Sequence, residues 1–190
     1  MKLFIAVLAL IFSFQSWTKA DDIGDLQIEG MSMGESLLDY FSKSEIENSN
    51  MNYYKKKKFI TIGFNDSSFL KTYDWLQLSY ERKDKNYKIT NLDGVLSFKN
   101  NYDGCLIKKK KITKDIQNIL NKKPDNYGGK HNADKSGKSI FESSEWNVDG
   151  GSIIVQCINW SKKMEKQFFD HLKVWIGSNE FRNWMKSNPY

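Results

Sequence analysis

Two histidines, His131 and His171, are the side chains of this sequence whose ordinary pKa best suits proton transfer near neutral pH. His131 lies three residues before Asp134, a spacing that lets both side chains share a turn and handle a proton or a metal ion. His171 follows Asp170 at the start of a strand pattern, where adjacent side chains project to opposite faces and do not form a natural pair. We expect both histidines to have structural or solvated roles, and we keep His131 as a candidate binding residue.

The sequence gives no convincing nucleophile motif. The Gly-x-Ser-x-Gly spacing occurs at residues 30–34, but no strand is expected before it, so the strained turn from strand to helix that exposes a nucleophilic serine is not predicted there. Ser136-Gly137-Lys138-Ser139 resembles the end of a phosphate-binding loop, but it lacks the upstream glycine and the strand–loop–helix context. We therefore predict no catalytic residue, no metal ligand and no cofactor.

Aromatic side chains are better candidates for a site. Trp75 and Trp175 each alternate with aliphatic residues in a strand pattern, so both rings should project to the sheet face opposite those aliphatic side chains. If helices cover only one face, Tyr73, Trp75 and Trp175 form an exposed aromatic surface for a ligand or a partner. The alternative is that these rings pack beneath the N-terminal helices or a long loop.

Cys105 and Cys157 are the only two cysteines of the chain. Their spacing is too long for a Cys-x-x-Cys redox centre, and no histidines lie beside them to complete a zinc site. In an oxidising compartment, an even pair of cysteines predicts a disulfide. Closing a loop of this length would contribute about 4 kcal/mol to stability.

Residues 1–20 have the three parts of a secretory signal. Lys2 supplies the positive charge, and residues 3–14 form an apolar run that is too short for the roughly 20 residues needed to span a bilayer. Thr18-Lys19-Ala20 ends the segment with a small residue. We expect cleavage after Ala20 and a soluble periplasmic or secreted product without a transmembrane segment.

The charge of the chain is mildly basic. The formal net charge of +6 falls by two when Lys2 and Lys19 are removed with the signal. Only Arg82 and Arg182 of the 29 basic residues are arginine, which disfavours specific nucleic-acid recognition because arginine provides the bidentate phosphate contacts. The lysine runs at 55–58 and 108–111 would support at most a weak contact with an anionic surface.

The apolar pattern predicts a single α+β domain over residues 21–190, with residues 21–30 as a loose leader. Ser32 with Glu35, and Ser44 with Glu47, have the spacing of capping boxes and predict short helices at the start of the domain. A period of two then predicts strands from residue 59 to about residue 98. Within them, Asp93-Gly94 is either a hairpin turn or a bulge in one long strand, and we favour the bulge.

A helix should follow from the N-cap residue Asn101 to a point before Pro124. Strands at 140–148, 153–160 and 172–176 come next, and Ser178 can cap a closing helix. The expected order is helix, βββα, βββα, in an antiparallel twisted sheet of about five to six strands with helices on one face. Whether the two βββα units arose by duplication stays open.

Residues 124–139 are polar and rich in glycine, and they carry both His131 and Asp134. We expect a long polar loop here. Connections of this length in a small domain are often functional.

Residues 28–41, IEGMSMGESLLDYF, and residues 169–172, FDHL, resemble the corresponding regions of small secreted proteins encoded by AT-rich marine bacteria. The resemblance implies an exported, single-domain product of a Gram-negative cell and hence a periplasmic location. It implies no activity, cofactor or catalytic residue.

Aromatic richness without a catalytic grouping favours an exported, non-enzymatic binding or protein-interaction module. Its partner would be a small ligand or an envelope protein. The alternative is a small periplasmic hydrolase that uses His131 and Asp134 on the long loop.

Overall fold

The computed structural model describes residues 22–51, 58–65 and 68–188, so the expected signal peptide at 1–20 lies outside the described residues. Short N-terminal elements precede a large sheet and two longer helices. In chain order the elements are η1 (Ile23–Asp25), β1 (Gln27–Ile28), β2 (Met31–Ser32), η2 (Leu37–Asp39), α1 (Lys43–Asn48), β3 (Phe59–Phe64), β4 (Trp75–Glu81), β5 (Ile89–Ser97), α2 (Tyr102–Leu120), β6 (Asp125–Lys130), β7 (Ile140–Val148), β8 (Gly151–Asn159), η3 (Met164–Lys166), β9 (His171–Ser178) and α3 (Asn179–Ser187).

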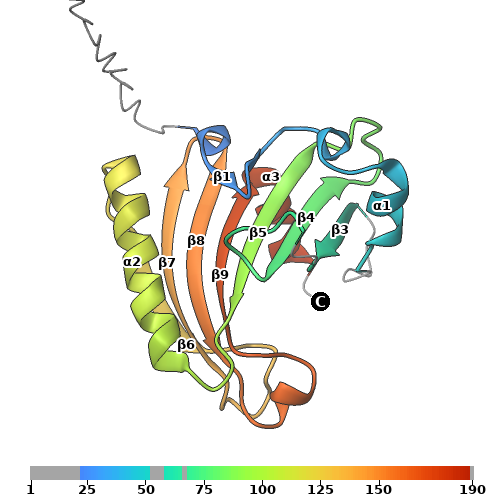
Figure 1. The fold of residues 1–190 in the computed structure, drawn as a ribbon. Coiled ribbons are helices and arrows are strands. Elements are labelled where there is room, and N and C mark those ends of the chain that lie inside the picture. Colours follow the sequence, from blue (N-terminus) through green and yellow to red (C-terminus); the bar gives the residue numbers. More distant parts are fainter. Residues whose placement is uncertain (1–21, 52–57, 66–67, 189–190) are drawn as a thin grey trace, which may run out of the picture.

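Seven strands form one antiparallel sheet in the order β3-β4-β5-β9-β8-β7-β6, and β1 pairs with β2 in a separate hairpin (Figure 1). The α+β class and the antiparallel sheet are confirmed, but the expected five to six strands are too few. The extra strand is β6, which lies within the stretch 124–139 that we expected to be one long loop. All six residues of β6 are exposed at the sheet edge, so the apolar alternation that reveals a half-buried strand is missing.

One face of the sheet carries the main apolar core. Side chains of alternate strand residues, among them Leu78, Leu92 and Val155, are fully buried on this face. The helix α2 covers the β8 and β9 side of it, and the N-terminal segment covers the β4 and β5 side (Figure 1). As expected, Asn101 caps α2, and the helix ends before Pro124.

The opposite face of the sheet is covered by α3, which begins at the expected cap Ser178. Phe181 of α3 packs edge-on against Phe59, and Trp175 and Ile154 complete this second cluster. The expectation that all helices lie on one face is therefore wrong. The apolar side of α3 buries the strand residues whose parity is opposite to that of the main core.

Cys105 and Cys157 form the expected disulfide, with their Cα atoms 6.0 Å apart. Both residues are fully buried. The bond joins the first turns of α2 to β8 and thus holds the helix against the sheet.

The N-terminal quarter is less helical than expected. The capping box of α1 is formed by Ser42 and Glu45 instead of Ser44 and Glu47. The backbone N–H of Ser32 donates to the Glu35 carboxylate at 2.7 Å, but this pair closes a turn beside β2 and does not start an α-helix.

The strand β5 runs unbroken through Asp93 and Gly94, so the expected single long strand is confirmed. The expected bulge does not lie at these residues, because the pairing of β5 with β4 is regular there and shifts register between Asn91 and Ile89 instead. At Gly94 the ring of Tyr73 lies directly over the backbone, and a Cβ there would stand only 2.7 Å from the ring carbons. Glycine is needed at this position because of that close approach.

Several loops and strand ends meet at one end of the sheet. The pairs Ser97 with His171, Ile158 with His171, and Lys130 with Ile140 place there the end of β5, the start of β9, the end of β8 and the β6–β7 connection. Residues 131–139, residues 160–170 and the start of α2 therefore surround the same space.

Candidate functional site

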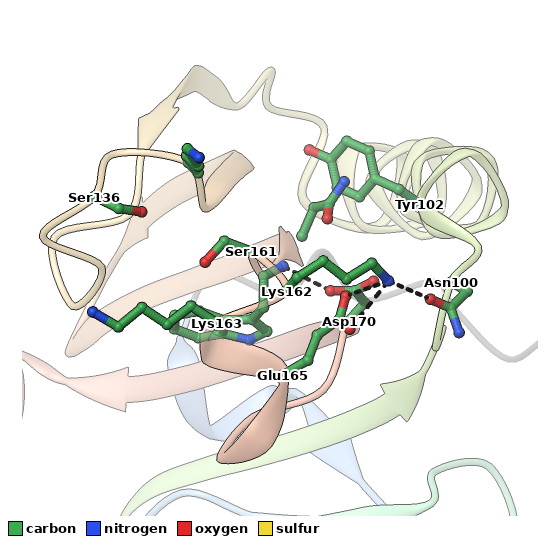
Figure 2. A pocket seen from close by; sticks show the side chains of 11 residues that line it. Asn100, Tyr102, Ser136, Ser161, Lys162, Lys163, Glu165 and Asp170 are labelled. Atoms are coloured by element: carbon green, nitrogen blue, oxygen red, sulfur yellow. Dashed lines mark hydrogen bonds and ion pairs between the residues drawn. The ribbon is translucent and has the colours of Figure 1, made fainter.

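A pocket of about 710 Å³ opens at this end of the sheet (Figure 2). Its walls come from the start of α2, the β6–β7 connection, and the loop from β8 to β9. The lining residues are Asn100, Tyr102, Ser136, Lys138, Asn159, Trp160, Ser161, Lys162, Lys163, Glu165 and Asp170.

The pocket contains three lysines and two acids, and both acids already have partners. Lys162 Nζ lies 3.1 Å from the Glu165 carboxylate and 3.4 Å from Asn100 Oδ1 (Figure 2). Asp170 is buried and accepts the backbone N–H of Trp160 at 2.7 Å. Lys138 and Lys163 make no ion pair with the residues that the structure describes, so the pocket has positive charge available for a ligand.

Two aromatic residues of the pocket hold polar hydrogens without a partner. Within the described ranges, neither Tyr102 Oη nor Trp160 Nε1 makes a hydrogen bond, although both atoms are buried. Burial raises the pKa of Tyr102 to about 12, and the negative charges of Glu142 and Asp170 add to the rise. Tyr102 therefore keeps its proton at neutral pH, so that Tyr102 Oη and Trp160 Nε1 are two buried hydrogen-bond donors without an acceptor in the described part of the chain.

Trp160 forms a fixed wall of the pocket. Only 5% of the residue is exposed. The ring of Phe168 stacks on it with a centroid distance of 4.5 Å, and the ring of His131 lies 4.4 Å away in a tilted arrangement. These contacts hold the indole in place without a ligand.

His131 and Asp134 do not form the proton-handling pair that the hydrolase alternative needs. The Asp134 carboxylate accepts the backbone N–H of Ser136 at 2.9 Å and the hydroxyl of Ser139 at 2.7 Å. Hydrogen bonds from Ser136 and Ser139 hold the pKa of Asp134 well below its usual range. His131 Nδ1 instead accepts the Ala133 backbone N–H at 3.3 Å. The Asp134 carboxylate therefore stabilises the backbone of its own loop and does not orient His131.

His131 and His171 both resist protonation. Burial lowers the pKa of His131, and the charge of Lys173 lowers it further while Asp134 opposes the shift. Burial likewise lowers the pKa of His171 to about 4. His171 Nδ1 lies 2.7 Å from the Phe169 carbonyl oxygen, so a neutral ring with its proton on Nδ1 donates to that oxygen.

The structure does not bring Tyr73, Trp75 and Trp175 together in one exposed surface. Trp175 is 3% exposed beneath α3, which matches the buried alternative described above. Trp75 lies on the same sheet face, partly exposed. Tyr73 covers Gly94 on the opposite, main-core face.

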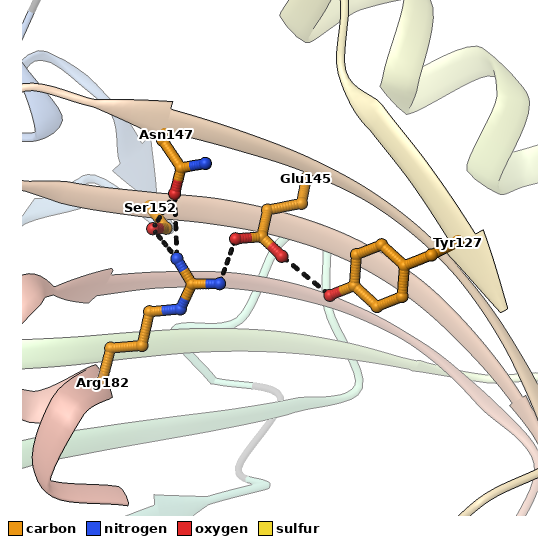
Figure 3. A network of polar contacts seen from close by, with 5 residues as sticks. All are labelled: Tyr127, Glu145, Asn147, Ser152 and Arg182. Atoms are coloured by element: carbon orange, nitrogen blue, oxygen red, sulfur yellow. Dashed lines mark hydrogen bonds and ion pairs between the residues drawn. The ribbon is translucent and has the colours of Figure 1, made fainter. Parts of the chain in front are cut away.

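A polar network at the other end of the sheet attaches α3 (Figure 3). Arg182 pairs with the Glu145 carboxylate and donates to Asn147 Oδ1 at 2.9 Å. Glu145 also accepts the Tyr127 hydroxyl at 2.8 Å. Because every charge in this network has a partner, we assign it a structural role.

The pocket residues were missed at the level of sequence. Lys138, Lys162 and Lys163 look like solvated loop lysines, and Trp160 looks like the end of an apolar strand. The usable signal was the position of these residues at strand ends, because antiparallel strands return their connections to common ends of the sheet.

No family model matches this chain, and comparisons with curated protein sequences and with solved structures find no match either. Among the described residues, no group of three or more histidine, cysteine, aspartate or glutamate side chains is arranged to hold a metal ion. None of the described helices has both the length and the apolar character needed to cross a membrane.

Proposed function

We propose that this protein is an exported, non-enzymatic binding protein whose pocket holds a small ligand with an anionic group beside an apolar or ring-shaped part. The supporting observation is the convergence of Lys138 and Lys163 with the unbonded donors of Tyr102 and Trp160 around one space of about 710 Å³.

The chemistry of these four side chains favours an anion with several oxygens. Lysine ammonium groups and neutral O–H and N–H groups all donate, and charge-assisted hydrogen bonds to such oxygens are the stronger kind. The partly exposed ring of Tyr102 adds apolar contact area for a ring, whereas the Trp160 ring is already covered by Phe168 and His131. A phosphate or carboxylate attached to a ring matches both features.

Binding is favoured over hydrolysis by the geometry around the long loop. The hydrolase alternative relies on His131 and Asp134, but the oxygens of Asp134 are occupied by serine N–H and O–H groups. A general base must lie within hydrogen-bond reach of the group that it activates.

The export of the protein is part of the same proposal. The disulfide between Cys105 and Cys157 is compatible with an oxidising compartment outside the cytosol, where such bonds persist. The signal at residues 1–20 and cleavage after Ala20 remain predictions from the sequence.

Calorimetric titration of the mature chain with phenyl phosphate tests the proposed site. We expect Lys138→Gln/Lys163→Gln to weaken binding by about tenfold or more, because two charge-assisted contacts are lost. The matched control is Lys135→Gln/Lys166→Gln, which removes two lysines of the same loops outside the pocket and should change binding less than about twofold.

The proposal would be overturned if wild-type protein failed to bind phenyl phosphate, or if both double variants weakened binding equally. Tyr102→Phe removes only one oxygen atom and should weaken binding to a smaller extent. Inorganic phosphate should bind less tightly than phenyl phosphate, because it has no ring to contact Tyr102.

A further inference from the structure

The two loops that form the pocket also carry exposed apolar side chains. Phe168 and Phe169 are 41% and 37% exposed, and Ile140 at the start of β7 is 40% exposed. Phe168 stacks on the pocket wall Trp160, so this apolar surface adjoins the pocket. We call residues 130–140 together with residues 160–170 the loop tip.

The backbone of the loop tip holds the two phenylalanines in place. The backbone N–H of Phe168 donates to the Met164 carbonyl oxygen at 3.0 Å. The Phe169 carbonyl oxygen accepts from His171, and burial keeps the pKa of His171 low enough for the ring to stay neutral. Exposure of both rings is therefore a property of an ordered turn.

The charge of the loop tip is positive on its outer side. Six lysines belong to it: Lys130, Lys135, Lys138, Lys162, Lys163 and Lys166. Its acids are occupied, because Asp134 and Asp170 are buried and accept hydrogen bonds, and Glu165 pairs with Lys162.

We propose that the loop tip docks on the surface of an anionic phospholipid membrane, with a lipid phosphate in the pocket and with Phe168 and Phe169 in the interfacial region. The inference rests on the proposed function only in that the pocket accepts a phosphate. Exposed aromatic side chains among lysines match a membrane surface, where apolar insertion and attraction to anionic lipids add together. Point-charge lysines suit mobile headgroups, whereas a fixed acidic protein surface would favour the arginine fork, which the loop tip lacks.

Sedimentation with vesicles of phosphatidylcholine containing about 30% phosphatidylglycerol tests the inference. The mature wild-type chain should bind these vesicles, should bind pure phosphatidylcholine much less, and should be released by added salt. Phe168→Ser/Phe169→Ser should lower binding by about tenfold, because the apolar contribution is lost.

The matched control is Leu38→Ser/Ile119→Ser. These side chains are also exposed, at 46% and 43%, but they lie near the opposite end of the sheet. The control should change vesicle binding by less than about twofold. Phe169→Ser alone provides a milder variant if the double variant fails to fold.

Two results would overturn the inference. One is equal binding of the wild-type chain to both kinds of vesicle. The other is unchanged, salt-sensitive binding by Phe168→Ser/Phe169→Ser, which would mark the loop tip as a site for an acidic protein or polymer. Titration with phenyl phosphate separates this failure from failure of the proposed function, since Phe169→Ser, which leaves Phe168 stacked on Trp160, should still bind that soluble probe.

Discussion

Asp93 is an acidic residue buried inside the sheet. It is 5% exposed in the middle of β5, and its Oδ1 has no hydrogen-bond partner in the described part of the chain. Burial raises the pKa of Asp93 to about 6, although the positive charge of Lys173 and a hydrogen bond from Asn91 oppose the rise. The carboxyl is thus neutral in mild acid and carries a buried charge above neutral pH.

Asp93→Asn should stabilise the protein at pH 8. Because the pKa of Asp93 is higher in the folded state than its model value of 3.8, the folded chain binds the extra proton between about pH 4 and 6, and stability falls as pH rises through that range. The substitution removes this cost and should raise the free energy of unfolding at pH 8 by about 2 kcal/mol. Below about pH 4 the difference should vanish.

Urea unfolding at both pH values measures this effect. Asp115→Asn, at an exposed position of α2, is the control and should show no comparable dependence on pH. An equal stability change for Asp93→Asn at both pH values would contradict the burial argument.

For single residues, the sequence suggests which types could serve in a site, but it does not show which residues become neighbours in the folded structure. His131 was a candidate because histidine titrates near neutral pH, yet its role in the structure is to pack against Trp160. Lys138 and Lys163 gave no local signal, because a lysine in a polar loop is usually only solvated.

The helices on the two faces of the sheet are attached to it by different kinds of interaction. The disulfide fastens α2, whereas α3 relies on an apolar cluster and on Arg182. If the two βββα units were copies, the rotation that places β5 on its antiparallel neighbour β9 would also place α2 on α3. This rotation keeps each helix on its own face of the sheet, but α2 and α3 lie on opposite faces. The second half also contains four strands instead of three, so the structure argues against duplication.

Arg182→Met should destabilise the attachment of α3. The side chains of Arg182 and Glu145 are only 18% and 8% exposed, so removing the guanidinium leaves a buried carboxylate without its charge partner. We expect a loss of about 3 kcal/mol in the free energy of unfolding. Glu145→Gln/Arg182→Met should recover part of that loss, because no buried charge remains.

Denaturant titration of the single and double variants forms the measurement. The exposed pair between Lys58 and Glu180 also links α3 to the sheet side and provides the control. Lys58→Met should lower the free energy of unfolding much less than Arg182→Met, because solvent screens an exposed ion pair. If Lys58→Met and Arg182→Met lowered the free energy of unfolding equally, burial of the ion pair between Arg182 and Glu145 would not increase its contribution to stability.

Strand prediction succeeded where one side of the strand is buried and failed where neither side is. A nearly continuous apolar run located β8, which is buried along most of its length, and alternation located β9. The edge strand β6 has neither signal, since all of its residues are exposed. Its existence depends on backbone pairing with β7, which composition does not record.

For the whole molecule, the predicted export has a direct chemical consequence. Chain recovered from the periplasm or the medium should begin at Asp21, since Ala20 precedes the expected cleavage site. Its intact mass should also be two hydrogens lower than that of the reduced chain, because Cys105 and Cys157 are joined. Mass spectrometry before and after reduction measures both features. A full-length chain with two thiols open to alkylation would contradict the prediction.

Periodicity and cysteine number were sufficient by themselves to determine an α+β chain with an antiparallel sheet and one disulfide, because these features depend on local alternation and on pairing of the only two thiols. The tertiary structure alone decided that α3 covers a second face and that Tyr102, Lys138, Trp160 and Lys163 surround one pocket. The physical reason is that antiparallel strands return distant loops to one end of the sheet, so that residues without any shared sequence pattern become neighbours.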